Sequence, residues 1–115
     1  MTAEALSKVI VKGMEEKKAS DILVMDLRKI KNSVTEFFVI CSGNSDIQLD
    51  AISKSIEEEV HKAGEPSSWR TEGKTNGQWI LMDYVNVVAH IFLKDQREFY
   101  SLEDLWGDAK TTRIN

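Results

Sequence analysis

Apolar residues recur along the chain with two different periods, and each period predicts a different element. Spacings of three and four near the start predict an amphipathic helix from residue 2 or 3 to about Lys17. Its apolar stripe consists of Leu6, Val9, Ile10 and Met14. The dense apolar run Asp21–Leu27 predicts a strand that is covered on both faces. After a polar loop at residues 28–35, Glu36–Ser42 predicts a second strand.

A second helix is predicted to follow this strand directly. Ser45 precedes Gln48 by three residues, which is the pattern of a capping box at a helix start. Gly64 and Pro66 predict that the helix ends near Ala63. Its predicted buried stripe consists of Leu49, Ile52, Ile56, Val60 and Ala63.

The C-terminal half carries most of the aromatic residues and predicts two antiparallel strands, 78–84 and 87–93. A polar loop at residues 65–77, with a short edge strand near 69–72, leads into them. One face of the pair is apolar apart from one hydroxyl and predicts core: Ile80, Met82, Tyr84, Val87, Ala89 and Ile91. The other face mixes aromatic rings with a carboxylate and an imidazole: Trp79, Leu81, Asp83, Val88, His90 and Phe92. Such mixed faces are typical of interfaces or sites.

An alternative interpretation makes the mixed face a second layer of core beneath a C-terminal helix. Asp83 and His90 would then satisfy each other and have no further role. The turn between the two strands is expected to be longer or irregular. A two-residue type I′ turn needs a positive φ at both positions, which Asn86 tolerates and β-branched Val85 does not.

A third helix is predicted at the C-terminal end. Asp95 and Glu98 form a second capping-box pattern, and Gly107 would end the helix. Its predicted apolar side consists of Phe99, Leu102 and either Leu105 or Trp106. The order α, β, β, α, β, β, α predicts an α/β (α+β) fold with a mixed sheet of four to five strands flanked by helices. In this fold the second helix is a crossover that joins parallel neighbours.

Composition and charge narrow the class of protein. At 115 residues the chain is expected to form one domain, 1–115, and 42% hydrophobic with 30% charged residues is typical of a globular fold. The single cysteine, Cys41, is expected to be a small buried residue. With neither a secretory signal pattern nor a membrane-spanning run, the protein is expected to be cytoplasmic. The net charge is −4 and basic residues are scattered along the sequence, so little direct nucleic-acid binding and a basic protein partner are expected.

The search for chemical motifs predicts a protein that is not an enzyme. The turn Gly43-Asn44-Ser45-Asp46 is similar to the Gly-Ser turn of nucleotidyltransferases, which binds a triphosphate at a helix start. Those enzymes also need two carboxylates on a nearby strand to hold metal ions, whereas Asp83 stands alone. Cys41, His61 and His90 lie on different elements without metal-ligand spacing. No cofactor, metal or catalytic residue is therefore expected.

Several strings nevertheless resemble a known family, in order and over nearly the whole chain. DILVMDL, FFVICSGNS, WRTEG, GQWILMDYVNVVAHIF and REFYSLEDLW resemble the Iojap family, the ribosomal silencing factors. The resemblance implies a catalytically inactive relative of the nucleotidyltransferase fold. It also implies binding to ribosomal protein fourteen of the large subunit, which blocks joining of the small subunit and represses translation. Val85-Asn86 departs from the Gly-Asp that is frequent in the family.

Large apolar residues and acids of the hairpin and tail are the predicted partner-binding residues, because aromatic anchors dominate interface affinity and acids suit a basic partner. They are Trp79, Leu81, Met82, Asp83, Tyr84, His90, Glu103, Trp106 and Asp108. Residues of alternate faces cannot all dock unless their strand lies at the sheet edge. Two alternatives remain: an enzyme that uses the turn at residues 43–46, and an oligomerising scaffold. A homodimer of the free protein is a further expectation.

Overall fold

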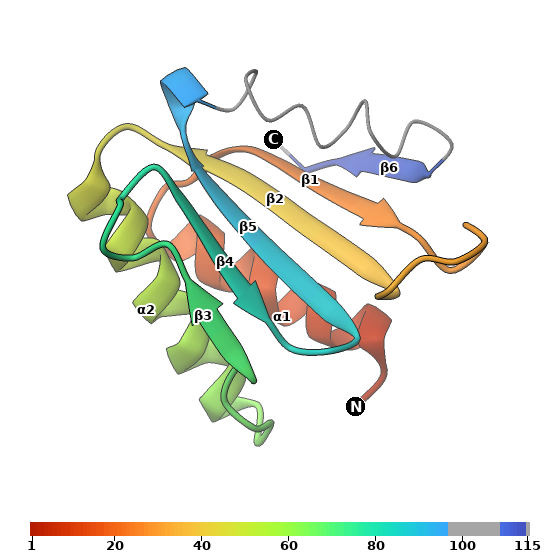
Figure 1. Cartoon of the computed structure of the whole chain (residues 1–115). Coiled ribbons are helices and arrows are strands. Elements are labelled where there is room, and N and C mark those ends of the chain that lie inside the picture. The colour runs from red at the N-terminus through yellow and green to blue at the C-terminus, as the bar shows by residue number, and fades with distance from the viewer. Residues whose placement is uncertain (97–108, 115) are drawn as a thin grey trace.

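The computed structural model describes residues 1–96 and 109–114 and forms one mixed sheet with two α-helices (Figure 1). The elements are α1 (Ala3–Glu16), β1 (Ser20–Asp26), β2 (Phe37–Gly43), α2 (Asp46–Lys62), β3 (Arg70–Glu72), β4 (Trp79–Asp83), β5 (Val87–Leu93), a 3-10 turn (Lys94–Gln96) and β6 (Lys110–Arg113). The sheet order is β3-β4-β5-β2-β1-β6. The predicted fold class, a mixed sheet flanked by helices, is confirmed.

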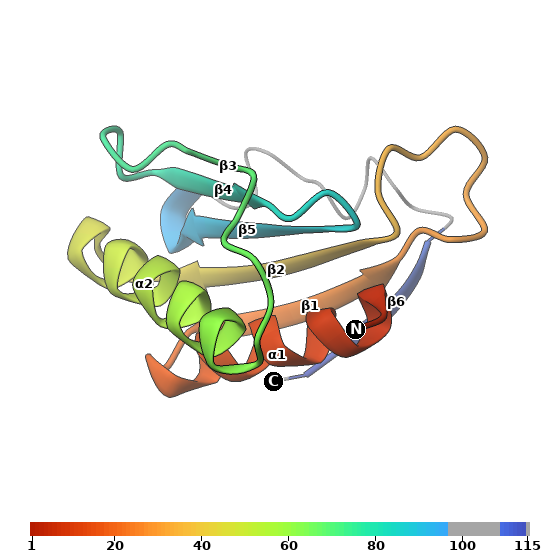
Figure 2. The same ribbon diagram turned by 90° about the horizontal axis from the view of Figure 1, so that it is seen from below.

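Both helices pack on the same face of the sheet (Figure 2). Alternation along each strand therefore sends side chains into two separate apolar clusters. The cluster beneath the helices includes Ile22, Val39, Cys41, Met82, Ala89 and Ile91. The cluster on the opposite face includes Leu23, Met25, Phe38, Ile40, Val88 and Phe92. Every residue of β2 is buried, because this strand is covered on both faces.

Strand pairing confirms one part of the predicted topology and corrects another. β1 and β2 form the predicted antiparallel pair, and β4 and β5 form the predicted hairpin. The parallel neighbour of β2 is β5, with Phe37 opposite Val87 and Gly43 opposite Leu93. We expected the strand that follows α2 to be the parallel neighbour of β2. The next long strand, β4, instead pairs antiparallel with β5, and β5 separates it from β2.

The prediction of four to five strands was too low, because the sheet has six. β3 is the short edge strand expected near residues 69–72, whereas β6 was not expected. Its sequence, KTTR, is short, polar and wholly exposed, so it has no apolar periodicity to reveal it. The predicted C-terminal helix, with Phe99, Leu102, Leu105 and Trp106, lies outside the described residues.

The start of α2 confirms half of the predicted capping box. Ser45 Oγ accepts a hydrogen bond from the Gln48 amide at 3.1 Å. The side chain of Gln48 differs from the motif, because its Oε1 accepts from the Asn44 amide at 2.6 Å instead of from Ser45. Nε2 of the Gln48 side chain also donates to the Lys17 carbonyl at 3.1 Å, which links α2 to the end of α1. The stripe of α2 is buried as predicted except for Ala63, which is exposed.

The two helices cross at very short range beside Gly13. A Cβ atom at position 13 would lie 2.7 Å from the Cα of Ile56, so only glycine fits without displacing the α2 backbone. At the same point Ser55 Oγ donates to the Gly13 carbonyl at 2.8 Å, in a buried hydrogen bond. Glycine in a helix costs about 1 kcal/mol relative to alanine. That cost is offset here by the close packing of the helices.

We expect Gly13→Ala to destabilise the protein, although alanine favours an isolated helix. Overpacking of a filled contact costs roughly 1–3 kcal/mol, and the atom that the new methyl meets is backbone. Urea denaturation followed by circular dichroism measures the difference. Glu15→Ala, an exposed substitution on the same helix, is the matched control. A Gly13→Ala protein as stable as the wild type would show that the helices can separate at no cost.

Candidate functional site

The turn between β4 and β5 has an uncommon backbone conformation. Val85 has a φ of 75°, although we expected a β-branched residue to avoid positive values. The expected departure from a type I′ turn is confirmed, because Asn86 does not have a positive φ. The Asn86 amide donates to the Tyr84 carbonyl at 2.9 Å across Val85, which is the three-residue bond of a γ-turn. The Tyr84 amide also donates to the Val87 carbonyl at 2.9 Å, so the hairpin closes over two residues.

Contacts from the end of β4 and from residues 35–37 hold this strained turn in place. Asp83 Oδ1 accepts from the Val85 amide at 2.7 Å, and Thr35 Oγ1 donates to the Val85 carbonyl at 3.0 Å. The Asn86 carbonyl accepts from the amides of Glu36 and Phe37. Strain of this kind persists only where surrounding contacts determine the conformation. The side chain of Val85 is nevertheless 58% exposed.

Two of the predicted partner-binding residues face the helices. Met82 is fully buried in the cluster beneath α1 and α2. Tyr84 donates its hydroxyl proton to Glu57 Oε1 on α2 at 2.7 Å. Burial, together with the Glu57 carboxylate, raises the pKa of Tyr84, so this hydroxyl keeps its proton. Burial alone would raise the pKa of Glu57, but hydrogen bonds from Tyr84 and Ser68 outweigh it and the pKa is lowered.

The opposite face of the hairpin brings together the aromatic residues that the sequence placed there. Trp79 Nε1 donates to His90 Nδ1 at 3.1 Å, and the Trp79 ring stacks on Phe92 with centroids 5.1 Å apart. Phe38 meets the His90 ring edge-on at 4.7 Å. His90 is only 4% exposed, whereas Trp79 and Leu81 are half-buried. Leu81 lies directly opposite His90 across the two strands.

The expected pair between Asp83 and His90 does not form. Asp83 bonds to the turn and lies 4.0 Å from the Arg70 guanidinium, while His90 accepts from Trp79. Because Nδ1 is the acceptor, the neutral ring carries its proton on Nε2. That nitrogen is buried and has no hydrogen-bond partner among residues 1–96 and 109–114. Burial lowers the pKa of His90 from 6.5 to about 4.

The outer edge of the hairpin carries exposed apolar side chains that the sequence patterns did not single out. Trp69, beside β3, is 70% exposed, and the Arg70 guanidinium lies 5.3 Å from the centre of its ring. The Trp69 amide donates to the Asp83 carbonyl at 2.7 Å, which places Trp69 at the same end of the sheet as Val85. Trp69 lies in a polar stretch without periodicity. The only sequence signal was an aromatic residue next to a predicted edge strand.

The remaining predicted site residues, Glu103, Trp106 and Asp108, lie outside the described part of the chain. The turn at residues 43–46 is described and is closed by its own side chains. The backbone amides of Asn44 and Gln48 donate to the side chains of Gln48 and Ser45, as described above. The Ile47 backbone amide donates to Asp46 Oδ1 at 2.9 Å. Three amides at this helix start are therefore occupied internally.

The described residues contain neither a cluster of possible metal ligands nor a candidate membrane-spanning helix. Within 1–96 and 109–114, no three His, Cys, Asp or Glu side chains come close enough together to hold a metal ion. No helix of the same part of the chain is long and apolar enough to cross a membrane. Cys41 is fully buried, as expected.

The observations so far define an α/β domain with one mixed sheet, two α-helices on one face, and an exposed tryptophan, Trp69, at one edge. Residues 1–115 match the family model described as ribosomal silencing factor during starvation. The chain belongs to this family, and the resemblance seen in the sequence is confirmed.

Individual relatives agree over most of the chain. The chain is 38% identical over 109 residues to a ribosomal silencing factor of Bacillus subtilis, an alignment covering 95% of this chain and 91% of that protein. It is 40% identical over 110 residues to the chloroplastic protein Iojap of Zea mays, covering 93% of this chain and 46% of that protein. A crystal structure of a Chromobacterium violaceum protein has a TM-score of 0.87 at 30% identity, covering 100% of this chain and 94% of that one. The Bacillus subtilis relative is named as a ribosomal silencing factor.

The buried state of His90 predicts a pH dependence of stability. The unfolded chain takes up a proton near pH 6.5, but the folded chain takes it up only near pH 4. Stability from His90 is therefore complete above pH 6.5 and is lost as the pH falls towards 4, by about 3 kcal/mol at most. We expect His90→Gln to flatten the fall in urea-unfolding free energy between pH 7 and pH 5. Equal slopes for the wild type and the variant would contradict a neutral buried imidazole.

Proposed function

We propose that the protein binds the large ribosomal subunit through ribosomal protein fourteen and sterically blocks joining of the small subunit. Translation falls because large subunits that carry the protein cannot form complete ribosomes. The observation that carries this proposal is membership, along residues 1–115, in a family whose relatives are named ribosomal silencing factors. We propose also that the protein acts without catalysing a reaction, in the cytoplasm.

The docking surface that we propose is the β3–β4 edge on the side of the sheet away from the helices. Trp79 and Leu81 are half-buried there, and Trp69 and Val85 are exposed beside them. Aromatic and aliphatic groups of this kind supply most of the affinity at protein interfaces. Met82, Tyr84 and His90 have a supporting role, because the first two contact the helical side and the third is buried beneath Trp79.

Charge supports a basic partner on this edge. Asp83 lies at the end of β4, and Glu72 lies on the adjacent edge strand. Arg70 lies within 4.0 Å of both carboxylates, which leaves one net negative charge in this group. Complementary charge accelerates encounter and disfavours wrong partners more than it adds affinity.

A nucleotide-binding enzyme, the alternative function, has less support. A triphosphate at the start of α2 would have to displace the hydrogen bonds that Ser45, Asp46 and Gln48 already make there. Gly77 also packs against this point, since a Cβ on it would lie 2.8 Å from the Cβ of Asp46. Asp83, the candidate metal ligand, is engaged with the hairpin turn.

We expect Trp69→Ala and Leu81→Ala to weaken binding to purified large subunits at least about tenfold while the protein still folds, because truncation of an interface anchor costs binding energy. Met82→Ala should instead cost roughly 2–5 kcal/mol of folding stability, because Met82 is fully buried. Co-sedimentation and thermal melting measure the two effects. Ile47→Ala, at an apolar residue 79% exposed at the start of α2, is the control and should change neither. Unchanged subunit binding of both edge variants would move the docking surface elsewhere.

We expect Asp83→Asn to slow association about threefold or more at low salt and to reduce its salt dependence. The amide oxygen can still accept from the Val85 amide, so the turn is kept and only the charge is lost. Stopped-flow measurement of association with ribosomal protein fourteen tests this expectation. Glu58→Gln removes one negative charge from the exposed side of α2 and is the matched control. If both variants associate equally fast, Asp83 does not face the partner.

A further inference from the structure

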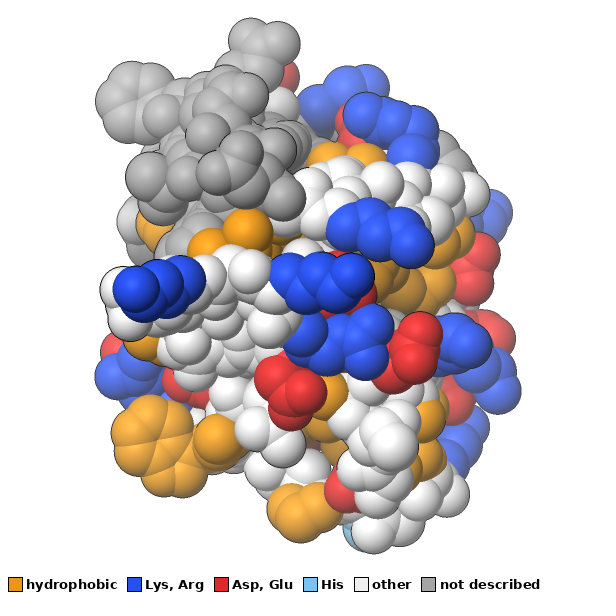
Figure 3. Space-filling view, turned by 90° about the vertical axis from the view of Figure 1, so that its right-hand side faces the viewer, with side chains coloured by type: hydrophobic (Ala, Val, Ile, Leu, Met, Phe, Trp, Pro, Cys, Tyr) orange, Lys and Arg blue, Asp and Glu red, His pale blue; other side chains and the backbone are white. Residues whose placement is uncertain are grey.

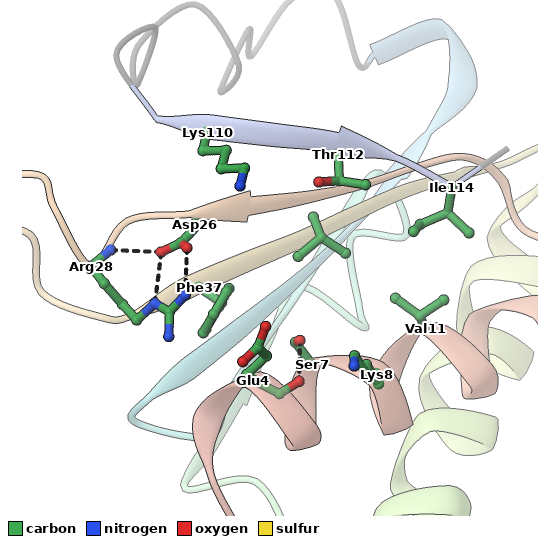
Figure 4. A pocket seen from close by; sticks show the side chains of 11 residues that line it. Glu4, Ser7, Lys8, Val11, Asp26, Arg28, Phe37, Lys110, Thr112 and Ile114 are labelled. Atoms are coloured by element: carbon green, nitrogen blue, oxygen red, sulfur yellow. Dashed lines mark hydrogen bonds and ion pairs between the residues drawn. The ribbon is translucent and has the colours of Figure 1, made fainter.

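A cavity of about 280 Å³ lies between α1 and the strands at the β6 edge of the sheet (Figure 4). Its base is apolar and includes Val11, Val24 and Phe37. Its rim is charged, with Lys8 from α1, Arg28 from the loop after β1, and Lys110 from β6. Two carboxylates, Glu4 on α1 and Asp26 at the end of β1, line the same cavity. Cations that are far apart in the sequence are therefore brought together by the fold.

The loop after β1 extends this positive rim. Lys29 and Lys31 follow Arg28 and are both exposed. We call the set Lys8, Arg28, Lys29, Lys31 and Lys110 the basic end. Figure 3 views the molecule from this side, where Lys and Arg side chains lie across the middle and the upper right of the surface with some Asp and Glu side chains among them. The sequence had indicated scattered basic residues, because their proximity arises only when α1, this loop and β6 meet.

The lysines of the basic end lack the close ion pairs that other lysines of the described residues make, although Glu4 and Asp26 lie in the same cavity. The four lysines form no ion pair with any residue in the described ranges. Arg28 is different, because its guanidinium binds Asp26 through two nitrogens at 3.0 and 2.7 Å and lies over the Phe37 ring. The Arg28 bond, with Lys110 nearby, lowers the pKa of Asp26, so that carboxylate stays charged and engaged.

Three other exposed lysines, on α1 and α2, have a different environment. Lys12, Lys54 and Lys62 each lie within 4.0 Å of a carboxylate on α2. The lysines of the basic end thus stand out within a protein whose net charge is −4. These lysines have no carboxylate within ion-pair distance among the described residues, and their like charges repel one another. An anionic partner would relieve this repulsion and be attracted by all of them.

We propose that the basic end contacts the phosphodiester backbone of ribosomal RNA when the protein is bound to the large subunit. This inference rests on the proposed function and adds a second contact to it. The protein partner proposed above is basic and would be repelled by these lysines, so they must face an anionic component of the subunit, and RNA is that component. The cations are spread over α1, a loop and β6 instead of converging on one point, which suits a chain of phosphates better than a single small anion.

The positions of the two surfaces allow one approach to engage both. Arg28, Val34 and Asn86 line a second hollow between the loop after β1 and the β4–β5 turn. The basic end therefore adjoins the end of the sheet that carries Asp83, Val85 and Trp69. Asp83 would meet the basic ribosomal protein while the lysines meet the neighbouring RNA.

The test compares two triple variants for binding to purified large subunits across a range of potassium chloride concentrations. Lys29→Ala/Lys31→Ala/Lys110→Ala removes unpaired lysines of the basic end. Lys12→Ala/Lys54→Ala/Lys62→Ala changes the net charge equally at paired lysines and is the control. Each lost phosphate contact lowers the slope of log affinity against log salt by about 0.7–0.9. We expect the basic-end variant to lose roughly 2 units of slope and at least about tenfold in affinity at low salt, with the control near wild type.

Hydroxyl-radical footprinting of the RNA in the same complexes identifies the anion. We expect riboses protected by the wild type to become accessible with the basic-end variant. An unchanged salt slope in a folded basic-end variant would overturn the inference and leave the proposed function intact. A reduced slope without RNA protection by the wild type would assign the lysines to an acidic protein surface and would also overturn it. Failure of the wild type itself to bind large subunits would remove the proposed function and this inference with it.

Discussion

The close crossing of α1 and α2 at Gly13 fixes the arrangement of much of the remaining structure. It lets both helices share one face of the sheet, and it fixes the position of three consecutive residues on α2. Ser55 bonds to the Gly13 carbonyl, Ile56 packs against the bare glycine, and Glu57 reaches outward to the hairpin. Glu57 accepts from the Tyr84 hydroxyl and from the Ser68 amide, next to Trp69. A contact between two helices is thus linked to the edge of the sheet proposed to dock.

The fold could be predicted from the sequence wherever burial imposes a period. The helix stripes, the two-faced hairpin and the start of α2 follow from the positions of apolar and capping residues, and the structure has them. β6 could not be predicted, because an exposed edge strand has no buried face to leave a pattern. The turn at Val85 was misjudged because local preference disfavours its φ, while contacts from Thr35, Glu36 and Asp83 impose it.

The candidate site was predicted only in part, for a related reason. Alternation correctly assigned Met82 and Tyr84 to one face and Trp79 and Leu81 to the other. Alternation does not tell which neighbour a polar group will choose, and His90 bonds to Trp79 instead of Asp83. The grouping of basic residues depends on which distant segments meet, and that information is in the tertiary structure alone. Charge on this protein is therefore segregated in space although it is mixed in sequence.

The two edges of the described sheet share a property that bears on how copies of the protein behave towards one another. β3 and β6 are three and four residues long, fully exposed, and carry Arg70, Glu72, Lys110 and Arg113. Unpaired edge strands are templates on which further chains can add, but short strands with charged side chains resist such addition. The open sheet therefore resists the addition of strands from other copies at its two edges. Copies of the protein at high concentration should therefore have little tendency to join edge to edge into aggregates.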